Sequence, residues 1–458
     1  MSTTTDAEPT IAARPKSIPR APGHWLLGNA RAMRDTPHTF AAELGLRSGG
    51  IGRFRILHRP MLAVTHPDYL RHIFVTHADH YERSFHYRTS QVTIGQGLIT
   101  TDGDYWRSQR RLIQPAFRTE HIRKVVPATA RAVEEAVARW SRTETVPLVA
   151  EMQTLTMAVM CRALLSVTLE SADALRFARA VRDSLYVVRR RNTSMCPMPL
   201  WVHNGTNRAL HETRDVLDAF VTRHLQPRLQ PDAPRHDDIV QQLLDARAPE
   251  TGERMPWQAL LDETKTLFTA GFETTATSLT WALHRLSHAP DVLARLHAEL
   301  DQVLAGRAPA WEDLPRLTYT HQVAQEALRL YPPVYSMGRA CVADDEIDGY
   351  RIRSGDTLLA SIYGAHLTPE FWPDPHRFDP DRFAPGRAWP KHAFMPFGLG
   401  KHLCIGNAFA MTEIVIALAL IAQRHTLVPR LPVDIPIRAQ ITLVPAGEIP
   451  VRLIPRSS

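Results

Sequence analysis

One cysteine, Cys404, lies in a glycine-rich segment between Phe394 and Ala410, directly before an apolar stretch. A thiolate at the start of a helix is stabilised by the helix dipole and by free backbone N–H groups. Phe397 can shield the sulfur from water. The glycines, which let the backbone turn sharply and approach a flat molecule closely, are Gly398, Gly400 and Gly406. A lone, shielded thiolate suits a single axial bond to a haem iron.

Other uses of this cysteine remain open on chemistry alone. An isolated cysteine is most often a small apolar core residue. A zinc site needs more ligands, and only His402 is close in sequence. A nucleophilic thiol needs a histidine partner, which the 22 histidines of the chain could supply.

The spacing Phe397-x-x-Gly400-x-His402-x-Cys404-x-Gly406 resembles the haem-thiolate signature of the cytochrome P450 family. The resemblance implies haem b (iron protoporphyrin IX), with Cys404 as the metal ligand. It also implies cofactor-binding roles for Phe397, Gly398, His402, Gly406, Trp106, Arg110, Arg339, Ala270 and Gly271. Among these, Trp106 and Arg110 are one helical turn apart. Arginine is also the residue that buried propionates prefer.

Two further motifs follow the family's order along the chain. Glu326 and Arg329 have the spacing of an ion pair on one helix face; alone, such a pair is usually a solvated salt bridge. The segment Phe378–Phe383 resembles the family's meander motif, with Asp381 where glutamate is commoner. The resemblance implies that Arg382 joins Glu326 and Arg329 in a structural triad that braces the cysteine segment.

The segment Ala270–Thr275 lies midway along a predicted long helix. Glycine and consecutive threonines are poor helix formers, although an ordinary helix interior could still contain them. Small Ala270 and Gly271 would leave room above a haem, and the Thr274 hydroxyl could bond back to a carbonyl. An adjacent acid and alcohol can relay protons. The segment resembles the family's oxygen-activation motif, which implies catalytic roles for Thr274 and Glu273.

The elements that must position these residues are mostly helical. Apolar residues at three-and-four spacing predict helices over 131–140, 215–224, 257–285, 291–304 and 407–424. Strands are predicted within 51–66, 347–352 and 357–362, and a hairpin within 441–454. The proline-rich stretch 372–390 predicts irregular backbone. Together these predict a mainly α (α+β) chain, and the resemblance implies the triangular helical P450 fold with small β-sheets.

The amino-acid composition indicates which cellular compartment and which binding partners to expect. The 458 residues are 44% hydrophobic, with four scattered cysteines, which excludes a disulfide scaffold and favours a reducing cytoplasm. We expect residues 1–20 to form a flexible arm and 21–458 a single haem domain. The longest uncharged apolar run near the C-terminus, 414–422, is too short to span a membrane, and the polar N-terminal segment lacks the apolar stretch of an anchor. The net charge of +7 suggests nucleic-acid binding as one candidate function, but the sequence contains no block of basic residues. Such a charge is better explained by docking of an acidic protein partner.

The resemblance implies a monooxygenase that inserts one oxygen atom from O2 into a hydrophobic small molecule, such as a terpenoid, fatty acid or polyketide. Electrons would come from NAD(P)H through a separate reductase and a ferredoxin or flavodoxin, and we expect a monomer. Basic residues near the cysteine side, Lys401, Arg107 and Arg111, could meet that donor. Substrate contacts are expected, by position, at Phe85, Tyr87, Ile94, Phe268, Val334, Tyr335, Met337, Ile441 and Thr442.

Three alternatives stay open. A haem-thiolate peroxygenase or a non-oxidative rearrangement enzyme would share the cysteine site, although such enzymes tend to lose the acid–alcohol pair that Glu273 and Thr274 form here. A haem-based gas sensor would not be an enzyme, but no signalling or DNA-binding module is apparent in the sequence.

Overall fold

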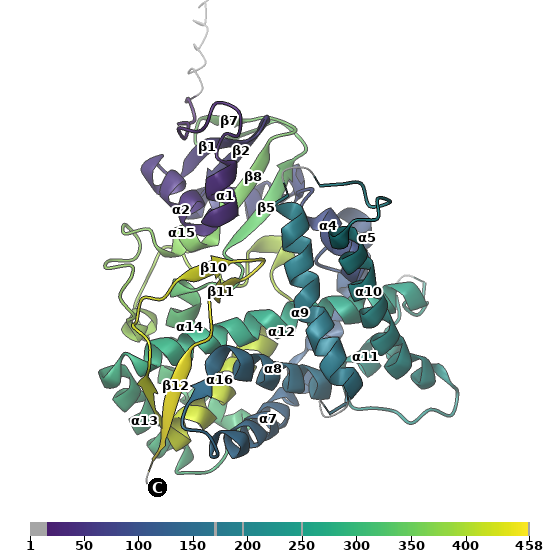
Figure 1. Ribbon diagram of the computed structural model, residues 1–458, viewed down its shortest axis with the longest axis vertical. Coiled ribbons are helices and arrows are strands. Elements are labelled where there is room, and N and C mark those ends of the chain that lie inside the picture. The colour runs from purple at the N-terminus through teal and green to yellow at the C-terminus, as the bar shows by residue number, and fades with distance from the viewer. Residues whose placement is uncertain (1–15, 169–171, 195–196, 249–250, 457–458) are drawn as a thin grey trace, which may run out of the picture.

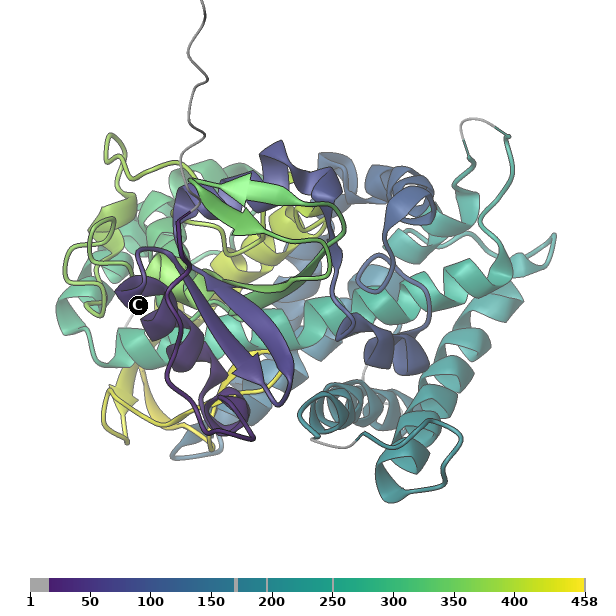
Figure 2. The same cartoon turned by 90° about the horizontal axis from the view of Figure 1, so that it is seen from above.

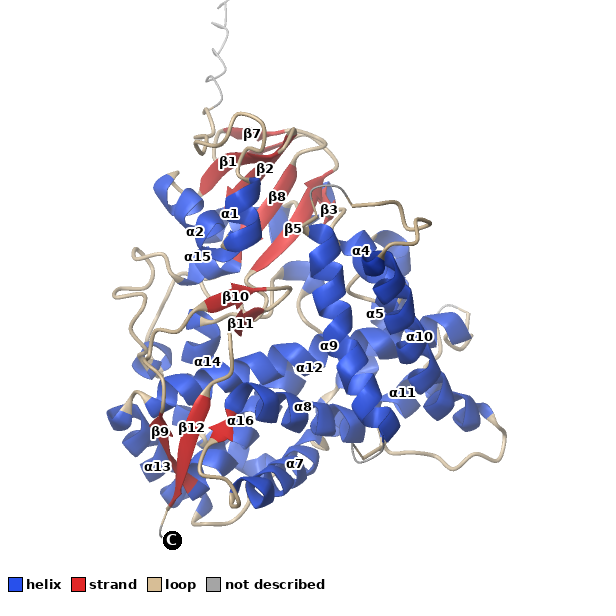
Figure 3. Cartoon of the chain, in the orientation of Figure 1, coloured by secondary structure: helices blue, strands red, loops and turns tan. Residues whose placement is uncertain are grey.

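The computed structural model describes residues 16–168, 172–194, 197–248 and 251–456 (Figure 1). Helices make up most of these residues, and the largest sheet lies at the end of the molecule where the N-terminal segment enters (Figure 3). The α-helices are α1 (Ala30–Asp35), α2 (Pro37–Arg47), α3 (Pro67–Arg71), α4 (Tyr87–Ile94), α5 (Gly103–Ile113), α6 (Thr119–Ile122), α7 (Val125–Trp140), α8 (Leu148–Leu165), α9 (Ala172–Asn192), α10 (Gly205–Leu225), α11 (Ile239–Asp245), α12 (Trp257–Ser287), α13 (Pro290–Leu304), α14 (Thr318–Leu330), α15 (Ile362–His366) and α16 (Asn407–Arg424). The five helices predicted from periodicity lie in α7, α10, α12, α13 and α16, and are confirmed.

The strands form one larger sheet and several small ones. They are β1 (Ile51–Ile56), β2 (Arg59–Val64), β3 (Tyr81–Arg83), β4 (Val146–Pro147), β5 (Ser336–Cys341), β6 (Asp345–Ile347), β7 (Tyr350–Ile352), β8 (Thr357–Ser361), β9 (His425–Pro429), β10 (Ile437–Ala439), β11 (Leu443–Pro445) and β12 (Pro450–Pro455). The larger sheet has the order β1-β2-β8-β5-β3. Its strands are antiparallel except for the β2–β8 pair, which is parallel.

The predicted hairpin within 441–454 is wrong. Strand β11 pairs with the preceding β10, whereas β12 pairs with β4 and β9 in a different sheet. Both strands carry the apolar residues of a hairpin, but periodicity does not identify the partner of a short strand. The hairpin is therefore one strand earlier, over 437–445, and its turn contains two of the predicted substrate contacts.

Helix α12 runs through the interior and organises the helical part (Figure 2). Its 31 residues give a length of about 46 Å at 1.5 Å per residue. It packs against α8, α10, α14 and α16. Since neighbours cover it on several sides, residues of every face are buried, including Leu260, Phe272 and Thr277. Such a helix can hold a few side chains rigidly at the middle of the molecule.

The N-terminal segment is attached to the sheet where the structure describes it. The backbone of Lys16 donates to the Gly349 carbonyl, and Arg53 donates to the Pro19 carbonyl. The part of the predicted arm that spans residues 1–15 lies outside the described residues, so only residues 16–20 are placed, and they are paired.

Two helices, α8 and α16, are long and apolar enough to cross a membrane. In the fold, 61% of the α8 residues and 72% of the α16 residues are buried against other parts of the chain. Their apolar character is therefore that of core helices.

Candidate active site

A cavity of about 980 Å³ lies between the middle of α12, the cysteine segment and the β5 side of the sheet. Cys404 lines it, as do Thr274 of α12 and Arg110 of α5. The fold thus brings three sequence motifs, separated by more than a hundred residues each, around one space. Of the other predicted cofactor contacts, those that also line the cavity are Trp106, Ala270, Gly271, Phe397, Gly398, His402 and Gly406.

Small residues of α12 face this space. The Thr274 hydroxyl donates to the Ala270 carbonyl at 2.7 Å, as the sequence predicted, and the Ser278 hydroxyl donates to the Thr274 carbonyl at 2.8 Å. Gly271 has a second reason to be glycine, because a Cβ there would approach the Met160 Cε atom of α8 to 2.6 Å. The helix therefore offers a hydroxyl to the cavity, and Met160 occupies the volume beside Gly271.

Glu273, next to Thr274 in sequence, does not line the cavity. Its side chain is buried, and burial raises the pKa of its carboxyl to about 7, although the Thr442 hydroxyl beside it partly offsets that increase. A carboxyl with a pKa near neutrality can accept and release a proton under ordinary conditions. Thr274 therefore places a hydroxyl at the cavity, and the adjacent Glu273 places a titratable acid in the buried layer that does not line it.

The cysteine segment is held in a tight conformation. Gly400 has a φ of 64°, and a Cβ at this position would overlap the Phe74 carbonyl. Gly398 has a φ of 77°. The Cys404 N–H donates to the Phe397 carbonyl at 2.9 Å. Gly406 differs from the expectation of a sharp turn, because its φ is −90° and a Cβ would make only an ordinary contact.

The electrostatics around Cys404 act in two directions. Burial raises the pKa of its thiol, while the Gly406 N–H and the charge of Arg110 both lower it. The last two groups stabilise a thiolate. A cationic metal at the sulfur would reinforce this effect, so the donor set fits a thiolate-ligated metal.

The triad that the resemblance implied is assembled. Arg329 donates from Nε and Nη2 to the two carboxylate oxygens of Glu326 at 2.7 and 2.8 Å, and both side chains are fully buried. Arg382 Nε lies 3.4 Å from Glu326 Oε1. Arg329 also donates to the backbone carbonyls of His366, Pro375 and Arg377. One buried arginine thus ties α14 to the irregular segment around residues 366–382.

His366, which sequence analysis missed, connects this triad to the cysteine segment. The Met395 N–H donates to His366 Nε2 at 2.9 Å, so Nε2 is the acceptor and Nδ1 faces the Arg329 carbonyl at 3.2 Å. Burial, with the charge of Arg329, lowers the pKa of His366 to about 3, which keeps the ring neutral. No sequence pattern marks this histidine among 22; only its position between the two segments reveals it.

Arg339 satisfies a specific test for a bound anion. Its side chain is 2% exposed, its guanidinium lies over the Phe74 ring at 4.7 Å, and its Nη1 donates to the Gly338 carbonyl. Its Nη2 is buried with no hydrogen-bond partner among the described residues. Arg339 does not itself line the cavity, although the adjacent Gly338 does. Because a buried, unpaired N–H of a cation is costly, its Nη2 fits a carboxylate bound beside it, such as a haem propionate.

His402 and Trp106 lie beside this position. Their ring centroids are 4.2 Å apart, and His402 Nε2 lies 3.0 Å from Asp102 Oδ1. Burial lowers the pKa of His402 to about 4, against the influence of Asp102. The structure adds Arg83, which lines the cavity and lies 3.2 Å from His402 Nδ1. Arg83 carries no sequence signal, because only the pairing of β3 with β5 places it here.

Most predicted substrate contacts line the same cavity. They are Phe85, Tyr87, Ile94, Val334, Tyr335, Met337, Ile441 and Thr442. Phe268 is the exception: it is fully buried and its ring packs edge-on against Phe177 of α9 at 4.9 Å. The α12 residues that line the cavity are at positions 266, 267, 269, 270, 271, 274, 275 and 278, and Phe268 is not among them. The expected contact of Phe268 is therefore corrected to a core contact.

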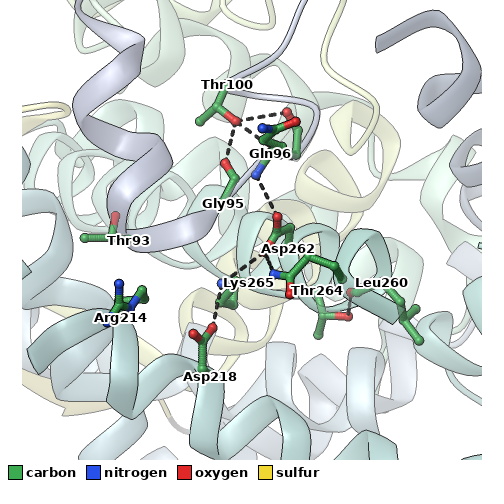
Figure 4. Close-up of polar contacts among 12 residues, drawn as sticks. Thr93, Gly95, Gln96, Thr100, Arg214, Asp218, Leu260, Asp262, Thr264 and Lys265 are labelled. Carbon is green, nitrogen blue, oxygen red and sulfur yellow. Dashed lines mark hydrogen bonds and ion pairs between the residues drawn. The ribbon is translucent and has the colours of Figure 1, made fainter. Parts of the chain in front are cut away.

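A buried polar network attaches the segment after α4 to α12 (Figure 4). The Gln96 N–H donates to Asp262 at 2.8 Å, and the Leu98 N–H donates to Glu263 at 3.1 Å. Lys265 Nζ pairs with Asp262 at 3.2 Å and with Asp218 of α10 at 2.6 Å. Since α4 carries Tyr87 and Ile94, this network fixes one wall of the cavity, and sequence analysis missed it.

Comparisons with known proteins agree with this geometry. Residues 19–448 match the Cytochrome P450 family. Cyclooctatin synthase of Streptomyces melanosporofaciens is 35% identical over 442 residues, 95% of each chain, and cyclooctat-9-en-7-ol 5-monooxygenase of that organism is 34% identical over 91% of each. Pentalenene oxygenase of Streptomyces avermitilis is 30% identical over 86% of this chain and 87% of its own.

The fold is also similar to a solved structure. A crystal structure of the cytochrome P450DA heme domain matches with a TM-score of 0.89 and 25% identity, and the match covers 97% of this chain and 98% of that one. The predicted fold class, mainly helical with small sheets, is confirmed.

Proposed function

The chain belongs to the cytochrome P450 family and is a haem-thiolate monooxygenase, and on that premise we propose that its substrate is a cyclic terpenoid. The observation that supports the substrate class is the identity of 30–35% to three enzymes whose names refer to cyclooctat-9-en-7-ol, cyclooctatin and pentalenene. The cavity agrees with it, because the lining includes apolar residues from α4, β5 and the 437–445 hairpin.

The residues around the cavity fit a haem. Cys404 would provide the metal ligand, and Arg339 would donate its unpaired Nη2 to a propionate. We propose further contacts to the haem propionates at the same edge of the cavity, from Trp106, Arg110, His402 and Arg83. When bound, the haem supplies O2 activation and the insertion of one oxygen atom into a C–H bond.

The chain's own residues provide proton delivery. The Thr274 hydroxyl lies at the cavity and can pass a proton inward, and Glu273 behind it can replace that proton because its pKa is close to 7. The Cys404 side chain is exposed towards the cavity, so a bound haem would cover its sulfur. These roles of Thr274, Glu273 and Cys404 are proposals that rest on position and pKa.

The substrate proposal is tested by spectral binding to the haem-loaded enzyme. We expect cyclic terpene hydrocarbons and alcohols to shift the haem spectrum at lower concentrations than linear fatty acids or polyketide lactones do. Fatty acids are the necessary comparison, because their carboxylates could pair with cationic side chains in the cavity lining. These side chains are Arg31, Arg59 and Arg189. Tighter binding of fatty acids than of every terpenoid would contradict the proposal.

The family implies a separate electron donor, and we propose a ferredoxin or flavodoxin with a reductase that uses NAD(P)H. Lys401 and Arg107 lie on the surface near the cysteine segment, each paired with a local acid, Asp79 or Asp104. We also propose that the protein is a cytoplasmic monomer of secondary metabolism. Its described cysteines, Cys161, Cys341 and Cys404, are free, which suits a reducing compartment.

Thr274→Ala tests proton delivery and separates the monooxygenase from a peroxygenase. With O2 and a surrogate redox partner, we expect product formation to fall about 10- to 100-fold while NAD(P)H is still consumed, because electrons are lost to peroxide or water when the proton relay is missing. Thr274→Ser, which keeps the hydroxyl, is the matched control and should retain most activity. Turnover with peroxide alone that exceeds the O2 reaction and is unchanged by the substitution would favour the peroxygenase.

A further inference from the structure

Three histidines surround one buried aspartate, away from the cavity. His72 Nε2 lies 2.8 Å from Asp345 Oδ2, and His77 Nδ1 lies 2.9 Å from Asp345 Oδ1. His80 Nδ1 lies 3.8 Å from Asp345 Oδ2. The ligand atoms of His72, His77 and Asp345 are all within 4.8 Å of one another. We propose that these four residues form a binding site for a divalent zinc ion.

The backbone places the histidines for this purpose. Residues His72–Thr76 form a π-helical turn, in which the His77 N–H donates to the His72 carbonyl at 2.9 Å. This wider turn brings His72 and His77 together, with their ring centroids 3.9 Å apart. Single π turns inside or beside α-helices occur frequently at functional sites. The next turn, Ala78–His80, returns His80 to the same side.

The aspartate lies at the centre of the cluster and is buried, with a side chain that is 4% exposed. The Tyr81 hydroxyl donates to Asp345 Oδ2 at 2.7 Å, the kind of supporting bond that orients a metal-binding carboxylate. A buried anion with several imidazoles around it favours a cation.

The ligand set selects zinc over the commoner hard cations. Neutral imidazole nitrogens and one carboxylate oxygen suit a tetrahedral zinc ion, with bonds of about 2.0–2.2 Å. Magnesium and calcium prefer oxygen ligands. His80 supports the assignment, because its Nδ1 is buried and has no hydrogen-bond partner among the described residues. A metal at the centre would satisfy that nitrogen, and His80 would be its fourth ligand.

The site would also brace the cysteine segment. It joins the π turn at residues 72–76 to strand β6, and the Phe74 carbonyl within that turn packs directly against Gly400. The Lys401–Asp79 ion pair at 2.8 Å also connects the turn at residues 78–80 to the cysteine segment. Zinc binding would therefore reduce opening of residues 72–80 and of the segment they support.

The experiment uses the haem-loaded full chain without a histidine tag. After treatment with a chelator, the protein is dialysed against zinc chloride in an excess of magnesium, and bound metal is quantified. We expect one tightly bound zinc per chain, zinc-dependent slowing of amide exchange over residues 72–80, and a zinc K-edge absorption spectrum with an imidazole-rich shell. No retained zinc, or a shell without imidazole, would overturn the proposal.

His77→Ala and His80→Ala are the informative variants, because both side chains are about half exposed and contribute little to the core. We expect each to weaken zinc binding by at least about 100-fold, beyond the usual effect of a supporting residue, with an unchanged thiolate–CO spectrum. His376→Ala, at an exposed histidine, is the matched control and should bind zinc as the parent does. Undiminished binding in both site variants would place the metal elsewhere and refute the assignment.

Discussion

Replacing the axial ligand, Cys404→Ser, is expected to abolish the characteristic thiolate–CO Soret band and to reduce monooxygenation to background, while some haem stays bound. The serine hydroxyl cannot supply the electron density that a thiolate gives to the iron. The side chain faces the cavity, so we expect the free energy of unfolding of the haem-free chain to change by less than about 0.5 kcal/mol. The measurement is a CO difference spectrum together with product formation.

The matched control for this ligand is Cys341→Ser. Cys341 is buried and donates from Sγ to the Ala343 carbonyl at 2.9 Å, a bond that a serine hydroxyl can keep. We expect its CO spectrum to equal that of the parent. If Cys404→Ser kept the thiolate band, the assigned ligand would be wrong, whatever the product assay showed.

Breaking the buried pair, by Glu326→Ala or Arg329→Ala, should prevent haem incorporation altogether. Removal of one partner leaves an uncompensated charge in a fully buried position, which costs about 3–5 kcal/mol. The loss extends beyond the pair, since Arg329 also holds three backbone carbonyls and His366 relays its position to Met395. The cysteine segment would then lose the support that sets its conformation.

The measurement is haem content per chain after purification, with thermal unfolding of the same samples. Arg351→Ala is the control, because its ion pair with Asp344 is more than half exposed on both sides and should cost at most about 1 kcal/mol. A soluble, fully haem-loaded Glu326→Ala or Arg329→Ala enzyme would contradict the bracing role.

The chemistry of the site could be predicted from local sequence patterns. The glycines and Cys404 occur within a few residues of one another, as do Ala270 and Thr274. Such local patterns reflect backbone conformation and helix phase, which depend on neighbouring residues. The five long helices were predictable for the same reason, since their apolar spacing records which face is buried.

The groups that surround those motifs depend on long-range packing, which local patterns do not record. Arg83 and His366 come from segments with no recognisable pattern, and they matter because strand pairing and the irregular segment bring them to the site. Phe268 differs from Ala270 by two positions, yet α9 covers it and the cavity does not reach it. The partner of β12 likewise depended on contacts across the whole chain. Long-range packing is decided by the sum of many weak contacts between distant segments, so no short stretch of sequence records it.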